Sequence, residues 1–142
     1  MNFASRIGRM LREGDTVLLS GDLGAGKSVV ARGVARALGV AGPMPSPTFT
    51  LMIPYQGEKR VYHFDLYRLS GPDEFYAAGL DEWFGGTGVC LVEWPETVEL
   101  SLRPCLRAAI RRVENEEERF IVLETDGVSL DAAALSQWRM DA

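Results

Sequence analysis

The order of apolar and polar residues divides the start of the chain into a helix, a strand and a second helix. Apolar residues recur at helical spacing between Phe3 and Gly14, which predicts a short amphipathic helix. The continuous apolar run over residues 16–20 predicts a strand that is buried on both faces of a parallel sheet. A second apolar stripe over residues 27–38 predicts another helix, and Gly39 is placed to cap its C-terminal end.

The next segment is typical of a loop followed by a hairpin. Three prolines fall within residues 39–47, so we expect neither a helix nor a central strand there. The runs TFTLMI (residues 48–53) and RVYHFDLY (residues 60–67) predict two strands, and the stretch PYQGEK between them predicts the turn of a hairpin.

The second half of the chain predicts a helix, a buried strand and a second hairpin. Residues 71–79 begin with a proline and two acids, as helices often do, and residues 88–94 predict a buried strand that a proline ends. Residues 105–113 fit both helical and alternating spacing. The polar run NEEE and the apolar run over residues 119–125 favour a hairpin, so we predict a strand there. Residues 131–138 predict a short closing helix.

This alternation predicts an α/β fold with a mostly parallel central sheet, flanking helices and a C-terminal hairpin. The chain has 142 residues, 46% hydrophobic and 25% charged, so we expect a single domain over residues 1–142. No apolar run is long enough to span a bilayer and no secretory signal is visible, so we expect a cytoplasmic location. The net charge of −5 argues against broad, non-specific binding to nucleic acid. Cys90 and Cys105 match no zinc-binding spacing and are expected to be buried free thiols.

One short stretch carries most of the candidate chemistry. GDLGAGKS, residues 21–28, lies between a predicted strand and a predicted helix and matches the pattern G-x-x-x-x-G-K-[ST]. Its glycines let successive backbone N–H groups turn inward onto phosphate oxygens, and the helix adds the positive end of its dipole. Lys27 offers a positive charge to the β- and γ-phosphates. The Ser28 hydroxyl suits Mg²⁺, which prefers oxygen ligands. The stretch therefore predicts nucleoside triphosphate binding by a P-loop NTPase fold.

A triphosphatase also needs acidic groups, and two of them stand at the ends of predicted strands. Asp65 and Glu93 lie at the strand edge where open α/β sheets bind their ligands, and either could provide the second metal carboxylate. Thr48 is placed like a loop hydroxyl that senses the γ-phosphate. His63 shares a strand face with Asp65, and we expect it to be a hydrogen-bond partner rather than a catalyst.

Two further features leave alternatives open. Trp94 directly follows Glu93 and is either a core residue or part of a docking surface beside the phosphate site. A stripe of basic residues is either a solvated face or, as the less common case, a phosphate lid or a partner patch. The stripe comprises Arg103, Arg107, Arg111 and Arg112.

The motifs GDLGAGKS, SPTFTL, YHFDLYRL and LVEWPE follow one another within residues 16–96. Because it has these four motifs in this order, the chain resembles the TsaE (YjeE) family of small bacterial ATPases. That resemblance implies a P-loop protein that binds ATP with Mg²⁺, hydrolyses it slowly and supports the TsaB–TsaD complex. The complex transfers a threonylcarbamoyl group to the adenosine beside the anticodon of tRNAs that read A-starting codons. The TsaB–TsaD complex would bind the tRNA, so this chain would contact tRNA only indirectly. The resemblance implies no membrane partner.

The resemblance also implies a role for individual residues. The ATP-binding residues would be Leu23, Gly24, Ala25, Gly26, Lys27 and Ser28. The catalytic residues would be Lys27, Thr48 and Asp65, and the Mg²⁺ ligands Ser28 and Glu93. Trp94 would complete a functional pair with Glu93. The family usually has threonine at the position of Ser28, and because both side chains carry a hydroxyl the metal role is preserved.

Three other classes of protein share a phosphate-binding loop. A GTPase reads guanine through an N/T-K-x-D stretch, and because Lys27 and Lys59 are the only lysines of the chain no such stretch exists. A small-molecule kinase would need an acceptor pocket and an arginine-bearing lid, which the basic stripe could supply. A catalytically silent nucleotide sensor is the third alternative.

Overall fold

The computed structural model describes residues 3–22, 24–98, 105–112 and 119–126. Its helices are α1 (Phe3–Met10), α2 (Lys27–Ala37) and α3 (Pro72–Ala77), with two short 3₁₀ helices, η1 (Leu80–Trp83) and η2 (Pro95–Val98). Its strands are β1 (Thr16–Ser20), β2 (Met52–Gln56), β3 (Arg60–Asp65), β4 (Gly88–Glu93), β5 (Cys105–Arg112) and β6 (Arg119–Asp126).

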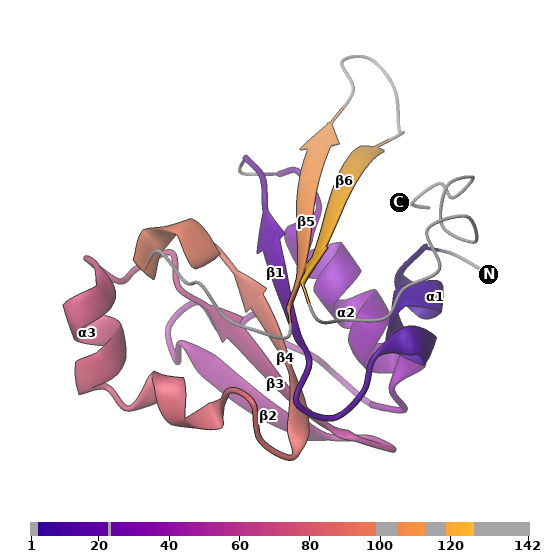
Figure 1. Ribbon diagram of the computed structural model, residues 1–142, viewed down its shortest axis with the longest axis horizontal. Helices are drawn as coiled ribbons and strands as arrows, with labels where there is room; N and C mark the ends of the chain where they lie inside the picture. Colours follow the sequence, from indigo (N-terminus) through magenta and orange to yellow (C-terminus); the bar gives the residue numbers. More distant parts are fainter. Residues whose placement is uncertain (1–2, 23, 99–104, 113–118, 127–142) are drawn as a thin grey trace.

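The strands form one six-stranded sheet in the order β2-β3-β4-β1-β5-β6 (Figure 1). β1 runs parallel to both of its neighbours, β4 and β5, and β3 runs parallel to β4. β2 and β6 close the two edges as the antiparallel hairpin partners of β3 and β5. The predicted α/β fold, with its mostly parallel sheet, flanking helices and C-terminal hairpin, is confirmed.

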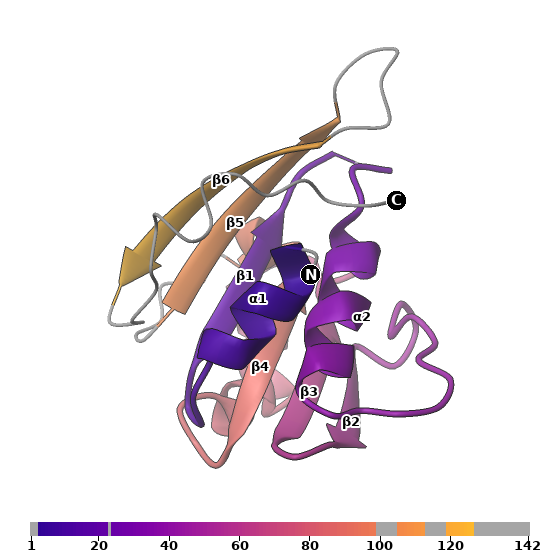
Figure 2. The ribbon, with the colours of Figure 1, turned by 90° about the vertical axis from the view of Figure 1, so that its right-hand side faces the viewer.

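Helices cover the sheet unequally on its two faces. α1 and α2 lie side by side on one face (Figure 2), over a core to which β1 contributes Val17 and Leu19. The other face packs under α3 and η1 around Phe64, Phe75 and Leu80. β1 alternates between the two cores, which explains why its sequence reads as a continuous apolar run.

One predicted strand, over residues 48–53, is wrong at its start. β2 begins at Met52, and the residues before it form a turn that the Leu51 N–H closes by donating to the Pro47 carbonyl at 2.8 Å. Leu51 has a φ of 67°, a left-handed conformation that ends strand geometry. Pro54, which we predicted in the turn, lies inside β2. β2 is an edge strand, so a proline nitrogen that faces the open edge costs the sheet no hydrogen bond.

The other predicted elements are found close to their expected bounds, including the strand over residues 105–113. The 3₁₀ helices η1 and η2 were not predicted. The closing helix predicted for residues 131–138 lies outside the described residues, and so does Arg103. Over the described ranges, no helix combines the length and apolar character needed to cross a membrane.

Candidate functional site

The phosphate-binding motif forms the loop between β1 and α2, as predicted. Gly26 precedes the helix with a φ of 106°, a left-handed conformation that residues with a Cβ rarely adopt. Gly21 lies so close to β5 that a Cβ there would collide with the carbonyl oxygen of Ile110. Between them, the Ala25 N–H donates to the Asp22 carbonyl at 3.0 Å and tightens the loop. The glycines therefore serve both the turn and the close approach of β5.

This loop and the neighbouring strand ends line one cavity of about 410 Å³. The register pairs Leu19 of β1 with Glu93 of β4, and Glu93 with Asp65 of β3, so these strands end at the same edge of the sheet. The lining residues are Gly24, Ala25, Gly26, Lys27, Ser28, Val29, Ser46, Thr48, Asp65, Glu93 and Trp94. The cavity thus brings together all the predicted site residues except Leu23, which lies outside the described residues.

Lys27 is held against the loop from which it extends. Its side chain is only 5% exposed, and its ammonium group donates to the carbonyl oxygens of Gly21 and Asp22. Burial lowers the pKa of Lys27, while the carboxylates of Glu96 and Glu93 act in the opposite direction. The cavity therefore holds a desolvated cation beside the glycine loop, and a buried ammonium group suits the charge of a polyphosphate.

Glu93 joins the loop to the sheet interior. The Ser28 hydroxyl donates to Glu93 Oε1 at 2.7 Å, and His63 Nε2 lies 2.7 Å from Glu93 Oε2. A hydroxyl and a carboxylate are the hard oxygen donors that Mg²⁺ takes in partial protein sites completed by water and phosphate. Ser28 and Glu93 therefore fit the metal role predicted for them. No cluster of three or more His, Cys, Asp or Glu side chains suited to a metal ion occurs among the residues that the structure describes.

Asp65 contacts the loop that precedes β2. Its Oδ1 accepts a hydrogen bond from the Tyr67 N–H at 3.1 Å, and its Oδ2 accepts a longer one, 3.4 Å, from the Thr48 hydroxyl. Thr48 and Ser46 share a further hydrogen bond of 2.8 Å. The carboxylate that the sequence suggested for catalysis is thus linked directly to the hydroxyl that it suggested as a phosphate sensor.

Trp94 combines an unusual backbone with an inward-facing ring. Its φ is 59°, and its N–H donates to the Leu19 carbonyl at 3.3 Å across the sheet. The half-buried ring lies over the Lys27 ammonium group on one side and packs against Tyr67, with ring centroids 4.8 Å apart. Trp94 is therefore part of the cavity wall rather than a member of either apolar core.

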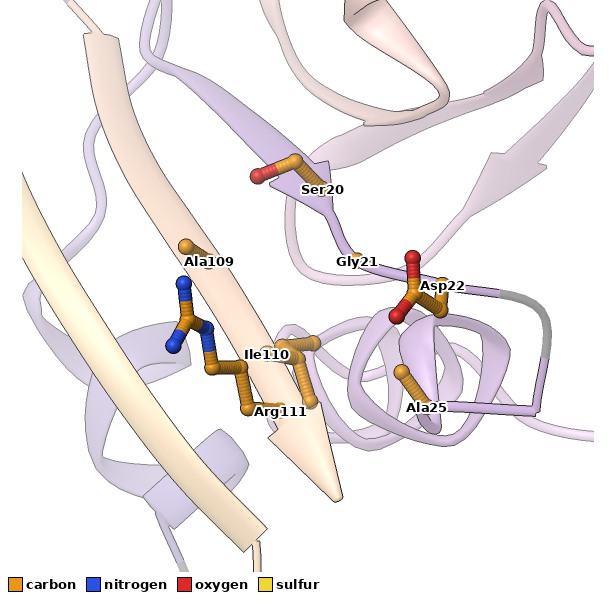
Figure 3. A pocket seen from close by; sticks show the side chains of 7 residues that line it. All are labelled: Ser20, Gly21, Asp22, Ala25, Ala109, Ile110 and Arg111. Atoms are coloured by element: carbon orange, nitrogen blue, oxygen red, sulfur yellow. The ribbon is translucent and has the colours of Figure 1, made fainter.

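A second cavity, of about 510 Å³, adjoins the first at Ala25, which lines both. Figure 3 shows Ala109 and Arg111 on the β5 side of this cavity and Asp22 and Ala25 on the loop side. The complete lining is Ser20, Gly21, Asp22, Ala25, Ala109, Ile110 and Arg111. Arg111, a member of the basic stripe predicted from the sequence, thus lies beside the phosphate-binding loop.

Sequence reasoning missed several of these lining residues. Ser46 could have been found from its place two positions before Thr48 in a loop already singled out. Asp22 lies within the quoted motif but in a position that the pattern leaves free. The contribution of β5 to the second cavity depends on its pairing with β1, which local sequence does not reveal.

Comparisons with known proteins agree with this geometry. The family model described as "Threonylcarbamoyl adenosine biosynthesis protein TsaE" matches residues 1–121. The tRNA threonylcarbamoyladenosine biosynthesis protein TsaE of Treponema pallidum is 45% identical over 96 residues, which are 68% of this chain and 71% of that protein. The protein of the same name from Rickettsia prowazekii is 34% identical over 132 residues, 92% of this chain and 91% of its own length.

A solved structure extends the agreement to the fold. The crystal structure of Bacillus subtilis YdiB matches this chain with a TM-score of 0.71 at 36% identity, over 87% of this chain and 76% of the other. With the strand–loop–helix cradle described above, these likenesses show that the chain has a P-loop NTPase fold and belongs to the TsaE family of threonylcarbamoyl adenosine biosynthesis proteins.

Proposed function

We propose that this chain binds ATP with Mg²⁺ in the first cavity, hydrolyses it slowly and so supports the TsaB–TsaD complex. The complex would modify the adenosine beside the anticodon of tRNAs that read A-starting codons. The observation that carries the proposal is the convergence of the glycine loop, Lys27, Ser28 and Glu93 on one cavity in a member of the TsaE family. We take residues 1–142 to act as a single ATPase domain.

The described residues divide the work of hydrolysis among them. The amides of Gly24, Gly26 and the first residues of α2 bind the phosphate oxygens, and Lys27 moves from the loop carbonyls to the β- and γ-phosphates. Ser28 and Glu93 hold Mg²⁺, which when bound neutralises charge on those phosphates. Asp65 orients the attacking water. Thr48 contacts the γ-phosphate and is coupled to Asp65 by their hydrogen bond. The water oxygen bonds to the γ-phosphorus as the bond to the β–γ bridging oxygen breaks, releasing ADP and phosphate.

The second cavity offers a place for the nucleoside. The acids of the first cavity lie on the β3 and β4 side of β1, so a nucleotide with its γ-phosphate there extends towards β5 on the other side. The cavity met in that direction has a volume typical of small-molecule sites. Arg111 provides a planar cation that stacks on aromatic faces, and Asp22 provides an acceptor for an amino group. We therefore place the adenine and ribose in this cavity.

The contacts of the loop that carries Thr48 support a dependence on the partner complex. The loop of Thr48 is tied to Asp65 by a single long side-chain bond, so nucleotide and partner can each shift its position. The net charge of −5 favours a role in which the partner complex, rather than this chain, grips the tRNA. We expect this ATPase to act in the cytoplasm.

The proposal is tested by ATP titration calorimetry and by phosphate release. We expect ATP to bind in the presence of millimolar Mg²⁺, phosphate release to be slow for the chain alone, and TsaB–TsaD to accelerate it. Lys27→Ala should weaken ATP binding about 10- to 100-fold, since it removes a charge-assisted hydrogen bond worth about 1.5–3 kcal/mol. Lys59→Ala is the matched control, because Lys59 lies in the turn between β2 and β3.

Three outcomes would overturn parts of this proposal. Absence of ATP binding by folded protein would remove the nucleotide role. Unchanged phosphate release in Asp65→Asn would remove the catalytic role of Asp65. Transfer of the γ-phosphate to an added small-molecule acceptor, in place of water, would make the chain a kinase.

A further inference from the structure

His63 is a buried polar residue to which the proposed function gives no task. It lies inside β3, two positions before Asp65, and is 3% exposed. The register pairs His63 with Leu91 and Asp65 with Glu93, so all four side chains point to the same face of the sheet, towards α2. Leu91 belongs to the apolar core on that face. A polar ring there is costly unless it is hydrogen-bonded.

The hydrogen-bond partner of His63 is Glu93. His63 Nε2 and Glu93 Oε2 are 2.7 Å apart, and Glu93 is also 3% exposed. A carboxylate that binds Mg²⁺ is ionised and can only accept hydrogen bonds, so in the proposed complex His63 Nε2 donates to Glu93 Oε2. The bond therefore constrains the carboxylate that accepts the Ser28 hydroxyl.

The two oxygens of Glu93 have different tasks as a result. Oε2 contacts His63 inside the sheet, and Oε1 accepts the Ser28 hydroxyl at 2.7 Å beside the phosphate-binding loop. Two fixed ends leave the carboxylate a single orientation. Without the imidazole, the Glu93 side chain could rotate and turn Oε1 away from the cradle, at the cost of the Ser28 bond alone.

We propose that His63 is a positioning residue that holds Glu93 Oε2 so that Oε1 and the Ser28 hydroxyl face the Mg²⁺ of a bound nucleotide. The inference rests on the proposed Mg²⁺-nucleotide function of this cavity. Residues that orient metal ligands in this way typically change metal affinity about 10- to 100-fold when they are replaced. His63 acts on the metal through Glu93 and does not touch the nucleotide.

Two variants of similar chemistry and different reach test the proposal. His63→Gln keeps an N–H donor on a side chain long enough to reach Glu93, whereas the amide of His63→Asn is one methylene shorter. The measured quantity is the gain in ATP affinity on replacing EDTA with Mg²⁺, determined by calorimetry for each variant. We expect His63→Asn to lose about 10-fold or more of that gain while its metal-free affinity stays within about 2-fold of the wild type. His63→Gln should retain most of the gain.

A residue with a purely structural role would behave differently. It would lower the thermal midpoint in both variants and leave the Mg²⁺-dependent gain unchanged, and that result in folded His63→Asn would overturn the proposal. Equal losses in the two variants would also overturn it. If the wild type binds ATP with no gain in affinity from Mg²⁺, the proposed metal role itself is wrong. If the wild type shows the gain and His63→Asn retains it, only the role of His63 is wrong.

A measurement on the unaltered chain covers the case in which a variant does not fold. His63 is the only histidine of the sequence, so its imidazole ¹⁵N signals need no assignment by mutagenesis. With a non-hydrolysable ATP analogue already bound, addition of Mg²⁺ should shift the Nε2 signal, because Glu93 then shares its charge with the metal. An Nε2 signal that does not move on saturation with Mg²⁺ would contradict the proposal.

Discussion

The ammonium group of Lys27 lies 3.7 Å from the centroid of the Trp94 ring. A cation over an indole face gains about 0.5–2 kcal/mol, and the gain is larger when water is excluded. Here the cation is buried, and the ring is itself packed against Tyr67. Trp94 thus stabilises the charged form of Lys27, which opposes the burial that lowers the Lys27 pKa.

Trp94→Ala should weaken ATP and tripolyphosphate binding about 3- to 10-fold, because the aromatic face stabilises the charged form of Lys27 that binds phosphate. Trp94→Phe keeps an aromatic face and should restore most of the affinity. Titration calorimetry with both ligands measures the effect. Trp94→Ala should also lose the ability to support tRNA modification by TsaB–TsaD. The ring is half-buried, so the thermal midpoint should fall only slightly. A large fall would instead show that Trp94 is mainly a packing residue.

Arg111→Ala should separate the nucleoside from the phosphates. If adenine and ribose occupy the second cavity, the variant loses about 5-fold or more in affinity for ATP and keeps its affinity for tripolyphosphate, which lacks a base. Calorimetric titration of each ligand provides the comparison. Arg60→Ala is the control, because Arg60 is also exposed but lies at the start of β3, at the opposite end of the sheet. Equal losses for both ligands would place Arg111 on the phosphates instead.

Local patterns were sufficient for most of the fold. The apolar run of β1, the glycine loop and the stripe of α2 follow from strand periodicity, phosphate-loop chemistry and helix periodicity, and the structure has all three. The start of β2 was misplaced because the left-handed φ of Leu51 arises from the turn it closes on Pro47, and nothing in a leucine signals that conformation.

The site was predictable to the extent that strand ends reveal it. Asp65 and Glu93 were found because each follows a buried strand, and parallel strands end at one edge. The inward orientation of Trp94 and the bond between His63 and Glu93 were not, since each depends on side chains from separate elements that meet in space: the end of β4 with the start of α2, and β3 with β4. Arg111 was found only as a member of a basic stripe, and its place beside the loop follows from the pairing of β5 with β1.

Cys90 should be unreactive in the folded protein and should make folding sensitive to alkaline pH. Burial raises the pKa of its thiol to about 12 from an ordinary 9.0, and its Sγ donates to the Trp83 carbonyl at 3.4 Å. The thiolate is the reactive form, so in Cys105→Ser, where Cys90 is the only cysteine, alkylation at pH 8 should be on the order of 1,000-fold slower in native protein than in denatured protein. Comparable rates would contradict burial of Cys90.

The sign of the pH dependence of stability follows from the same shift. Below pH 9 the Cys90 thiol is neutral in both the folded and the unfolded chain, and its contribution is fully present. As the pH rises from 9 towards 12, the unfolded chain releases this proton and the folded chain keeps it, so the free energy of unfolding falls. Urea unfolding across this range should show a smaller loss in Cys90→Ala than in the wild type.

Gly8→Ala should destabilise the fold through the contact between α1 and α2. A Cβ at Gly8 would collide with the Ala37 side chain and lie 3.1 Å from the Val34 carbonyl oxygen, which as helix backbone moves little. Overpacking of this kind costs about 1–3 kcal/mol, against about 1 kcal/mol that alanine gains over glycine inside a helix. The free energy of unfolding, measured in urea, should therefore fall by up to about 2 kcal/mol. Gly86→Ala is the control, because an added Cβ there meets nothing within 4 Å. A Gly8→Ala protein more stable than the wild type would show that the two helices separate at little cost.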